Sequence, residues 1–152
     1  LVCSEMFIRD RYIRGRSASP GNKFESGKKP MSTMAPVIVF DKNKDLMLIT
    51  GSPGGSLIPA AILRVVTGII DFDLNIGEAT MLTRVHKDWP TTGILHEKTL
   101  SSDLAKGLNI IGHKVTEEHT MGSTQSIHIV DGINYGYADL RRPNASVSIQ
   151  PN

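Results

Sequence analysis

The chain has 152 residues, 39% of them hydrophobic and 21% charged, and a formal net charge of +2. This composition is that of one globular domain or part of one. Residues 1–29 hold seven basic and three acidic side chains, so the rest of the chain is net acidic, which disfavours binding to nucleic acid.

The sequence shows no pattern for a metal, a cofactor or a membrane span. Cys3 is the only cysteine, so neither a disulfide framework nor a thiolate metal site is expected. No two of the five histidines have the i, i+4 spacing of a zinc-binding helix. The longest apolar run, residues 57–70, contains Pro59 and Arg64 and is too short to span a bilayer.

Residues 1–20 are charged and show neither a helical nor a strand period. We expect this segment to be non-native or disordered and to lack consistent packing on the rest of the chain. We interpret residues 1–12 as an extension that does not belong to the domain and leave them out of the reasoning on its fold. The alternative is an ordinary polar N-terminal extension. The folded part is expected within residues 21–152.

Two short strands are the first predicted elements. Residues 37–40 and 46–50 are apolar, and the polar residues 41–44 between them predict a turn. Directly afterwards comes a glycine-rich turn, residues 50–56, with the sequence Thr-Gly-Ser-Pro-Gly-Gly-Ser. This turn is expected to join the second strand to a helix.

The helix predicted over residues 57–70 is apolar on nearly every face and must be covered on both sides. Ser56 is its expected N-cap, and Pro59 is tolerated because it falls in the first turn. A second, shorter helix is predicted after it, because Asn75 is followed three residues later by Glu78, as in a capping box.

The C-terminal half mixes strands with one further helix. The predicted elements are strands at 84–89, 94–98 and 114–118 and a helix, capped by Ser102, at 103–111. Residues 124–130 and 133–138 predict a hairpin, because Asp131-Gly132 between them favours a type I′ turn. The fold class is therefore α+β, with at least two antiparallel strand pairings.

The glycine-rich turn is the candidate functional feature. A strand, a tight turn and a helix start leave unpaired backbone N–H groups directed at one spot. Such a spot can hold a phosphate, a carboxylate or the oxyanion of an acyl-transfer intermediate. The alternative is that Gly54 and Gly55 only make a tight connection. Neither the Walker pattern nor Gly-x-Gly-x-x-Gly is present, which counts against nucleotide binding.

Two further blocks flank this turn in the chain: residues 30–36, Pro-Met-Ser-Thr-Met-Ala-Pro, and residues 121–127, Met-Gly-Ser-Thr-Gln-Ser-Ile. Together the three blocks resemble the γ-glutamyltransferase (γ-glutamyltranspeptidase, glutathione hydrolase) family, in the order and approximate spacing of its small subunit. Weaker similarity at 70–72, 75–79, 84–86 and 112–115 extends the resemblance over residues 21–142. Residues 1–12 match no segment of the family.

The resemblance implies an N-terminal-nucleophile hydrolase fold, a four-layer αββα sandwich with mostly antiparallel sheet, shared by both processed subunits. It implies that a proenzyme cuts itself and that the new N-terminal threonine, with its own amine as base, attacks a γ-glutamyl carbonyl. The acyl-enzyme then passes the γ-glutamyl group to water or an amine. The implied partners are a γ-glutamyl substrate such as glutathione, the upstream part of the small subunit and the large subunit.

The resemblance also assigns roles to residues at matching positions. Gly54 and Gly55 correspond to the paired glycines whose N–H groups form the oxyanion hole. Ser32 and Thr33 align with a Ser-Ser pair that holds the substrate's α-carboxylate, although the methyl group of Thr33 narrows the site. The alternative for Ser32-Thr33 is a capped turn before the first strand.

Four other matching residues are expected to have structural roles. Arg84 and Asp139 are expected to pair or to tie loops together. Ser123 and Gln125 are expected to form hydrogen bonds in the core near the site.

The family's catalytic threonine lies well upstream of the Ser-Ser pair, whereas Thr33 is the first threonine here. We therefore expect the C-terminal part of a small subunit, without its nucleophile and inactive by itself. The alternatives are a non-catalytic anion-binding module that uses the Gly54-Gly55 turn and a structural domain. The resemblance further implies a periplasmic or extracellular location.

Overall fold

The computed structural model divides the chain into two compact units, residues 1–34 and 35–152. It describes residues 26–27, 34–88, 93–143 and 145–149. All elements reported below lie in the second unit. The predictions made for residues 1–20, and for Ser32 and Thr33, fall outside the described residues.

Four antiparallel strands form the larger sheet, in the order β1-β2-β6-β7. They are β1 (Val37–Phe40), β2 (Leu46–Gly51), β6 (Gln125–Val130) and β7 (Ile133–Ala138). In the turn between β1 and β2, Asp41 Oδ1 accepts hydrogen bonds from the N–H groups of Asn43 and Asp45. Asp131 and Gly132 have φ values of 51° and 76°, as a type I′ turn requires. Both predicted hairpins are confirmed.

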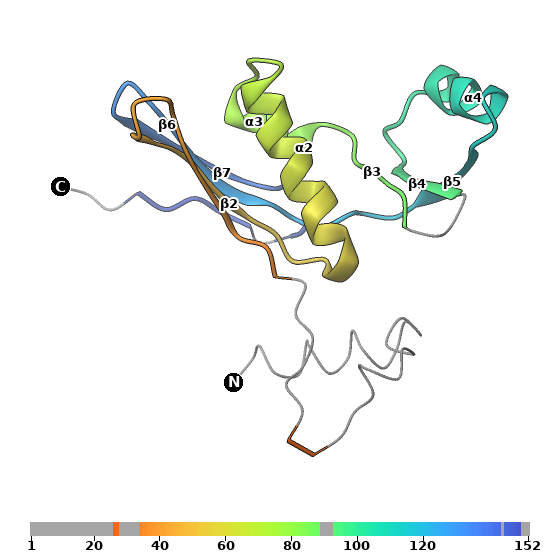
Figure 1. Ribbon diagram of the computed structural model, residues 1–152, viewed down its shortest axis with the longest axis horizontal. Coiled ribbons are helices and arrows are strands. Elements are labelled where there is room, and N and C mark those ends of the chain that lie inside the picture. Colours follow the sequence, from red (N-terminus) through yellow and green to blue (C-terminus); the bar gives the residue numbers. More distant parts are fainter. Residues whose placement is uncertain (1–25, 28–33, 89–92, 144, 150–152) are drawn as a thin grey trace. The chain divides into compact units, whose positions relative to one another are not determined.

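Two helices cover one face of this sheet (Figure 1). A 3-10 turn, η2 (Gly55–Leu57), leads into α2 (Ile58–Ile70), and α3 (Ile76–Met81) follows. The core lies between the sheet and the helices, and its buried members are Leu48, Val65, Ile69, Ile76 and Ala79. Complete burial of a large aliphatic side chain contributes roughly 1.5–3 kcal/mol, so this cluster fixes α2 and α3 on the sheet.

A second sheet has three strands in the order β3-β4-β5. They are β3 (Val85–His86), β4 (Gly93–Glu97) and β5 (Lys114–Glu118). The β3-β4 pair is antiparallel, whereas β4 and β5 are parallel, and α4 (Ser102–Ile110) supplies the crossover that a parallel pair needs. The fold is therefore the predicted α+β mixture of antiparallel sheet and helices, with one parallel pairing that was not predicted.

Of the three N-cap residues predicted from the sequence, the structure confirms one and corrects two. Asn75 Oδ1 accepts the N–H of Glu78, whose carboxylate accepts the N–H of Asn75, so the predicted capping box of α3 is confirmed. Ser56 was wrong as the N-cap of α2, because it lies inside the 3-10 turn. Ser102 was wrong by one residue, because the Ser101 hydroxyl accepts the N–H of Leu104 and caps α4.

The second face of the larger sheet and the outer side of α2 carry exposed apolar side chains. Ile38, Ile49 and Ile127 are cross-strand partners in register, with exposed fractions of 59%, 38% and 42%. On α2, Leu63 and Ile70 are exposed by 62% and 52%. The inner side of α2 is therefore packed against the sheet. The sequence predicts that its outer side is covered as well, but the described residues do not cover it.

Candidate active site

The glycine-rich turn joins the end of β2 to the start of α2, as the sequence predicts. Gly54 has a φ of 144° and Gly55 a φ of 59°, conformations that favour glycine. The N–H of Leu57 donates to the carbonyl oxygen of Gly54 at 3.1 Å. Within the described part of the chain, neither glycine N–H donates to a backbone carbonyl. Two donors therefore lie at a helix start, where the helix dipole favours negative charge.

This turn packs closely against the segment around Gly122. A Cβ built on Gly122, whose φ is 73°, would lie 2.7 Å from Ser52 Oγ and 3.0 Å from the Pro53 carbonyl oxygen. A Cβ on Gly54 would lie 3.3 Å from the Cα of Gly122. Ser52 Oγ accepts the N–H of Ser123 at 3.0 Å and donates to the Pro53 oxygen at 2.8 Å. The structure thus brings together two of the three blocks that carried the resemblance.

Neighbouring residues of the same two blocks are linked as well. The hydroxyls of Thr50 on β2 and Ser126 on β6 form a buried hydrogen bond of 2.8 Å. Gln125 Nε2 donates to the hydroxyl of Ser123 at 3.4 Å. The expected hydrogen bonding of Ser123 and Gln125 is therefore present, but only Ser123 lies in the core, because Gln125 is exposed.

A buried charge network, Arg84, Glu97, Asp139 and Arg141, lies next to the Gly122 segment. Arg141 Nε and Nη2 each approach one carboxylate oxygen of Glu97 at 2.7 Å. Arg84 Nη2 lies 2.6 Å from Asp139 Oδ2, and Arg141 Nη1 lies 3.2 Å from Asp139 Oδ1. The predicted pairing of Arg84 with Asp139 is confirmed, with both side chains buried.

The same network binds the backbone on both sides of Gly122. Glu97 Oε1 accepts the N–H of Met121 at 3.0 Å, and Arg84 Nη1 donates to the Met121 carbonyl oxygen at 2.6 Å. Asp139 Oδ2 accepts the N–H of Thr124 at 2.9 Å. The buried charges therefore satisfy backbone groups that the sheets leave unpaired.

Hydrogen bonds within the network keep both acids ionised. Burial would raise the pKa of Glu97, but hydrogen bonds from Arg141 and from the N–H groups of Met121 and Arg84 hold that pKa below its ordinary value. Burial likewise opposes ionisation of Asp139, but the N–H of Arg141 and the charge of Arg84 lower its pKa.

Burial acts in the same direction on both arginines, but their net pKa shifts are opposite. Burial lowers the pKa of Arg84, and the nearby charge of Arg141 adds to this effect. Burial would also lower the pKa of Arg141, but its hydrogen bonds to Glu97 raise it. Because arginine stays protonated in proteins, all four side chains are charged near neutral pH.

The pair of Glu97 with Arg141 is the part of this network that the sequence did not predict. The two residues are separated by 44 positions. An acidic residue in an apolar strand, and the Asp-Leu-Arg run that ends at Arg141, were available signals. Neither signal identifies the partner, because the pairing depends on how the two sheets meet.

The structure describes two of the four predicted site residues. Gly54 and Gly55 lie at the strand-to-helix turn where the sequence puts them, and their role as donors to an oxyanion stays a prediction. Ser32 and Thr33 lie outside the described residues, so the carboxylate site assigned to them stays a prediction as well.

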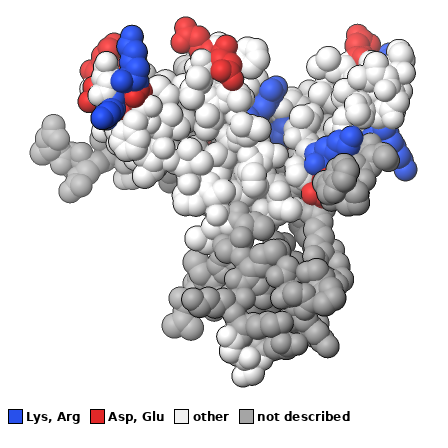
Figure 2. All heavy atoms as spheres, viewed as in Figure 1, with Lys and Arg blue, Asp and Glu red and all other residues white. Residues whose placement is uncertain are grey.

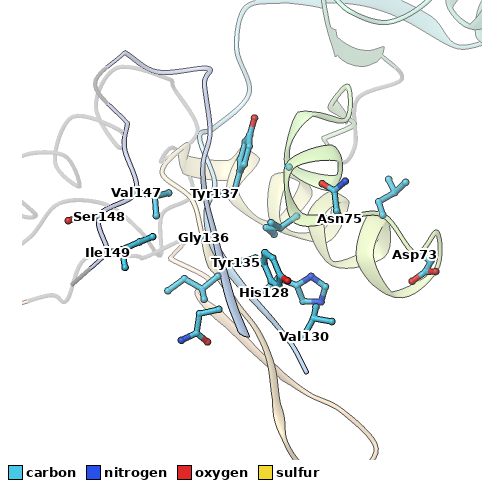
Figure 3. Close-up of a pocket in the computed structure, with 15 residues that line it drawn as sticks. Asp73, Asn75, His128, Val130, Tyr135, Gly136, Tyr137, Val147, Ser148 and Ile149 are labelled. Atoms are coloured by element: carbon cyan, nitrogen blue, oxygen red, sulfur yellow. The ribbon is translucent and has the colours of Figure 1, made fainter. Parts of the chain in front are cut away.

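A groove of about 1200 Å³ runs along β7, away from the glycine-rich turn. Figure 3 shows Asp73 and Asn75 on one side of the hairpin and Val147 and Ile149 on the other. His128 also lines it, and burial lowers the pKa of this histidine. Neither Gly54 nor Gly55 lines this groove, so it is not the predicted site.

On the face shown in Figure 2, acidic and basic side chains lie in several small groups, some of one sign and some of both, with neutral surface between them. Within the described ranges, no three His, Cys, Asp or Glu side chains are grouped as metal ligands would be. No helix among these residues has the length and apolar character needed to cross a membrane.

Known sequences point to one family. The model of the gamma-glutamyltranspeptidase family matches residues 6–149. The chain is 41% identical over 130 residues to a glutathione hydrolase proenzyme of Escherichia coli, and the aligned region covers 85% of this chain and 22% of that protein. It is 31% identical over 137 residues to a glutathione hydrolase proenzyme of Bacillus subtilis, covering 87% and 23%. The chain thus spans less than a quarter of either relative. Because the family match begins at residue 6, the prediction that residues 1–12 match no segment of the family is wrong for residues 6–12. Whether residues 1–20 are non-native or disordered stays a prediction.

Solved structures of two gamma-glutamyltranspeptidases and of one cephalosporin acylase share the fold. A gamma-glutamyltranspeptidase from Helicobacter pylori superposes with a TM-score of 0.75 at 33% identity, over 82% of this chain and 69% of that one. One from Pseudomonas nitroreducens gives a TM-score of 0.77 at 28% identity, over 88% and 70%. A cephalosporin acylase from Bacillus halodurans gives 0.76 at 25% identity, over 86% and 25%.

Proposed function

The chain belongs to the gamma-glutamyltranspeptidase family, and from this premise we propose that residues 21–152 act as the C-terminal portion of its small subunit. In the whole protein, a γ-glutamyl amide such as glutathione is cleaved through an acyl-enzyme, and the γ-glutamyl group passes to water or an amine. The names of the two relatives, both glutathione hydrolase proenzymes, support this substrate class. The described sheet and helices then form part of a four-layer αββα sandwich.

The glycine-rich turn carries the proposal. Attack on an amide carbonyl places negative charge on its oxygen, and N–H donors fixed at that point stabilise the transition state. Gly54 and Gly55 supply two such groups, with no backbone acceptor among the described residues, at the start of α2. Loss of one donor of this kind typically costs about 2.7–4 kcal/mol.

The other roles lie outside the described residues. We assign the α-carboxylate of the substrate to Ser32 and Thr33, whose hydroxyl and backbone N–H groups are suited to a carboxylate. The nucleophile is assigned to the family's N-terminal threonine, which acts with its own amine as base. These 152 residues alone are therefore expected to give no turnover. We also propose a location outside the cytoplasm.

The competing proposal is a non-catalytic domain that binds an anion at the same turn. An experiment with a chimeric protein distinguishes the two proposals. The matching 130 residues of the Escherichia coli relative are replaced by those of this chain, and turnover is followed by release of a chromophore from a γ-glutamyl anilide. We expect the chimera to cut itself into subunits and to turn over, and the isolated chain to be inactive. A self-cleaved chimera without turnover, or turnover by the isolated chain, would contradict the proposal.

Substitution of a glycine tests the assigned role. Gly54→Ala places a methyl group 3.3 Å from the Cα of Gly122 and forces alanine to adopt a φ of 144°, so the donors must move. We expect kcat of the chimera to fall by about 10²–10³. The matched control is Gly107→Ala, because a Cβ there meets nothing within 4 Å. Self-cleavage and circular dichroism of both variants report whether the fold is intact.

A further inference from the structure

We propose that Ser52 is a positioning residue that holds the Gly54-Gly55 turn against the Gly122 segment. The proposal rests on the proposed function, because the position of the turn affects catalysis only if the glycines donate to an oxyanion. Ser52 itself has no assigned contact with substrate in this proposal. It acts through the backbone of its neighbours.

The hydroxyl of Ser52 makes two hydrogen bonds at once. It accepts the N–H of Ser123, which lies 71 residues away in the chain, at 3.0 Å. It donates its own proton to the carbonyl oxygen of Pro53, the residue before Gly54, at 2.8 Å. A hydroxyl is the small neutral group that can both donate and accept in this way. Ser52 thus joins the two blocks and fixes the peptide that enters the glycine pair.

The segment on the other side of this contact is itself held rigidly. Both backbone groups of Met121 are bound by the buried charge network, through Glu97 at 3.0 Å and Arg84 at 2.6 Å. Gly122 then approaches Ser52 so closely that no side chain fits between them. A continuous series of contacts therefore runs from the buried charges through Met121 to Ser52 and the turn.

The glycine pair needs this external support. Gly54 and Gly55 have no side chains, and both occupy conformations with positive φ. Gly54 occupies the N-cap position of the 3-10 turn and, as a glycine, has no side chain that could cap it. Hydrogen-bond donors act on a transition state only when their position is accurate, and a misplacement of about 1 Å can cost about 10²-fold in rate. Ser52 supplies a restraint that β2 and α2 do not supply by themselves.

The first test measures the contact directly, by amide hydrogen exchange of the 152-residue chain. Ser52→Ala is expected to speed exchange at Ser123 by about tenfold or more, because the N–H of Ser123 loses its acceptor. Ser52→Thr keeps the hydroxyl and is expected to stay near the parent. The matched control is Ser101→Ala, which removes the same kind of bond at the start of α4. Unchanged exchange at Ser123 in Ser52→Ala would overturn the proposal.

The second test measures catalysis in the chimera described above. Ser52→Ala is expected to lower kcat by about 10–100-fold with KM unchanged, because oxyanion donors act mainly in the transition state. Ser52→Thr is expected to recover most of the loss, and Ser101→Ala to have no effect on kcat. An unchanged kcat in Ser52→Ala would overturn the positioning role.

The two tests separate this inference from the function on which it rests. A parent chimera without turnover would contradict the proposed function and, with it, the catalytic role of Ser52. Faster exchange at Ser123 would still show the contact in that case. A parent chimera with normal turnover and a Ser52→Ala variant with equal kcat would contradict the Ser52 proposal alone.

Discussion

Arg141 contacts Glu97 through two parallel hydrogen bonds, Nε to Oε1 and Nη2 to Oε2, each 2.7 Å long. Glu97 is the last residue of β4 in the smaller sheet, and Arg141 follows β7 of the larger sheet. The pair therefore ties the two sheets together. The side chains are only 9% and 7% exposed, so water screens this interaction weakly.

Replacing Arg141 should destabilise the chain strongly. Arg141→Met keeps the bulk of the stem but leaves the carboxylate of Glu97 buried without its main partner. Removing one member of a buried pair typically costs about 3–5 kcal/mol, measured as the free energy of unfolding in urea. The control is Lys106→Met, which removes an exposed pair with Asp103 and should change stability by less than about 1 kcal/mol. Equal effects of the two substitutions would contradict this prediction.

Stability should fall in acid. The pKa values of Glu97 and Asp139 are lowered in the folded state, so their contribution is present above the unfolded-state values of about 4.3 and 3.9. It is lost as the pH falls through the lower folded values. Urea midpoints measured from neutral pH downward should therefore decline below about pH 5. Glu97→Gln should be less stable at neutral pH and show a shallower decline.

His128 must be separated from this effect. Burial lowers its pKa, so the unfolded chain binds a proton more readily, and stability also falls as the pH drops below about 6.5. His128→Gln should remove this earlier part of the decline and leave the part below about pH 5. A decline below pH 5 that is identical in the parent and in Glu97→Gln would contradict the role given to the network.

Two glycine-to-alanine substitutions should have opposite signs. At Gly122 the added methyl would lie 2.7 Å from Ser52 Oγ and 3.0 Å from the Pro53 oxygen, at a φ of 73°. We expect Gly122→Ala to destabilise the chain by at least about 1–2 kcal/mol. Gly107 lies within α4, where a methyl meets nothing, so Gly107→Ala should stabilise by up to about 1 kcal/mol. Thermal melting of both variants checks the signs.

The elements that local sequence determines were predicted well. Asn75 and Glu78 are three residues apart and identify a capping box without any knowledge of the fold. Asp131-Gly132 identifies a type I′ turn in the same way. Capping by Ser101 was misassigned by one position, because two adjacent serines offer the same chemistry and only the backbone geometry distinguishes them.

The contacts that build the candidate site were harder to predict. Ser52 and Ser123 are 71 residues apart, and Glu97 and Arg141 are 44 apart. No local pattern relates such residues, because their pairing depends on the strand order and on the parallel β4-β5 crossover. The resemblance identified the blocks around Gly54 and Gly122 as related, but it did not reveal that their backbones touch.

The exposed isoleucines of the larger sheet should make the isolated chain prone to association. Ile38, Ile49 and Ile127 form a row across three strands, on the face opposite α2. A contiguous exposed apolar patch marks a missing partner or an aggregation hazard, and the proposed αββα sandwich would cover this face. Replacing all three by threonine keeps β-branched residues in the strands and should change unfolding free energy by less than about 2 kcal/mol.

This triple variant should elute as a monomer in light-scattering chromatography and bind less of an apolar dye than the parent. The control is Leu48→Thr, which places a hydroxyl in the core at a residue with 0% exposure and should cost about 3 kcal/mol or more without improving solubility. If the triple variant associates as strongly as the parent, the isoleucine row is not the surface responsible. The outer side of α2, where Leu63 and Ile70 are exposed, would then account for the association.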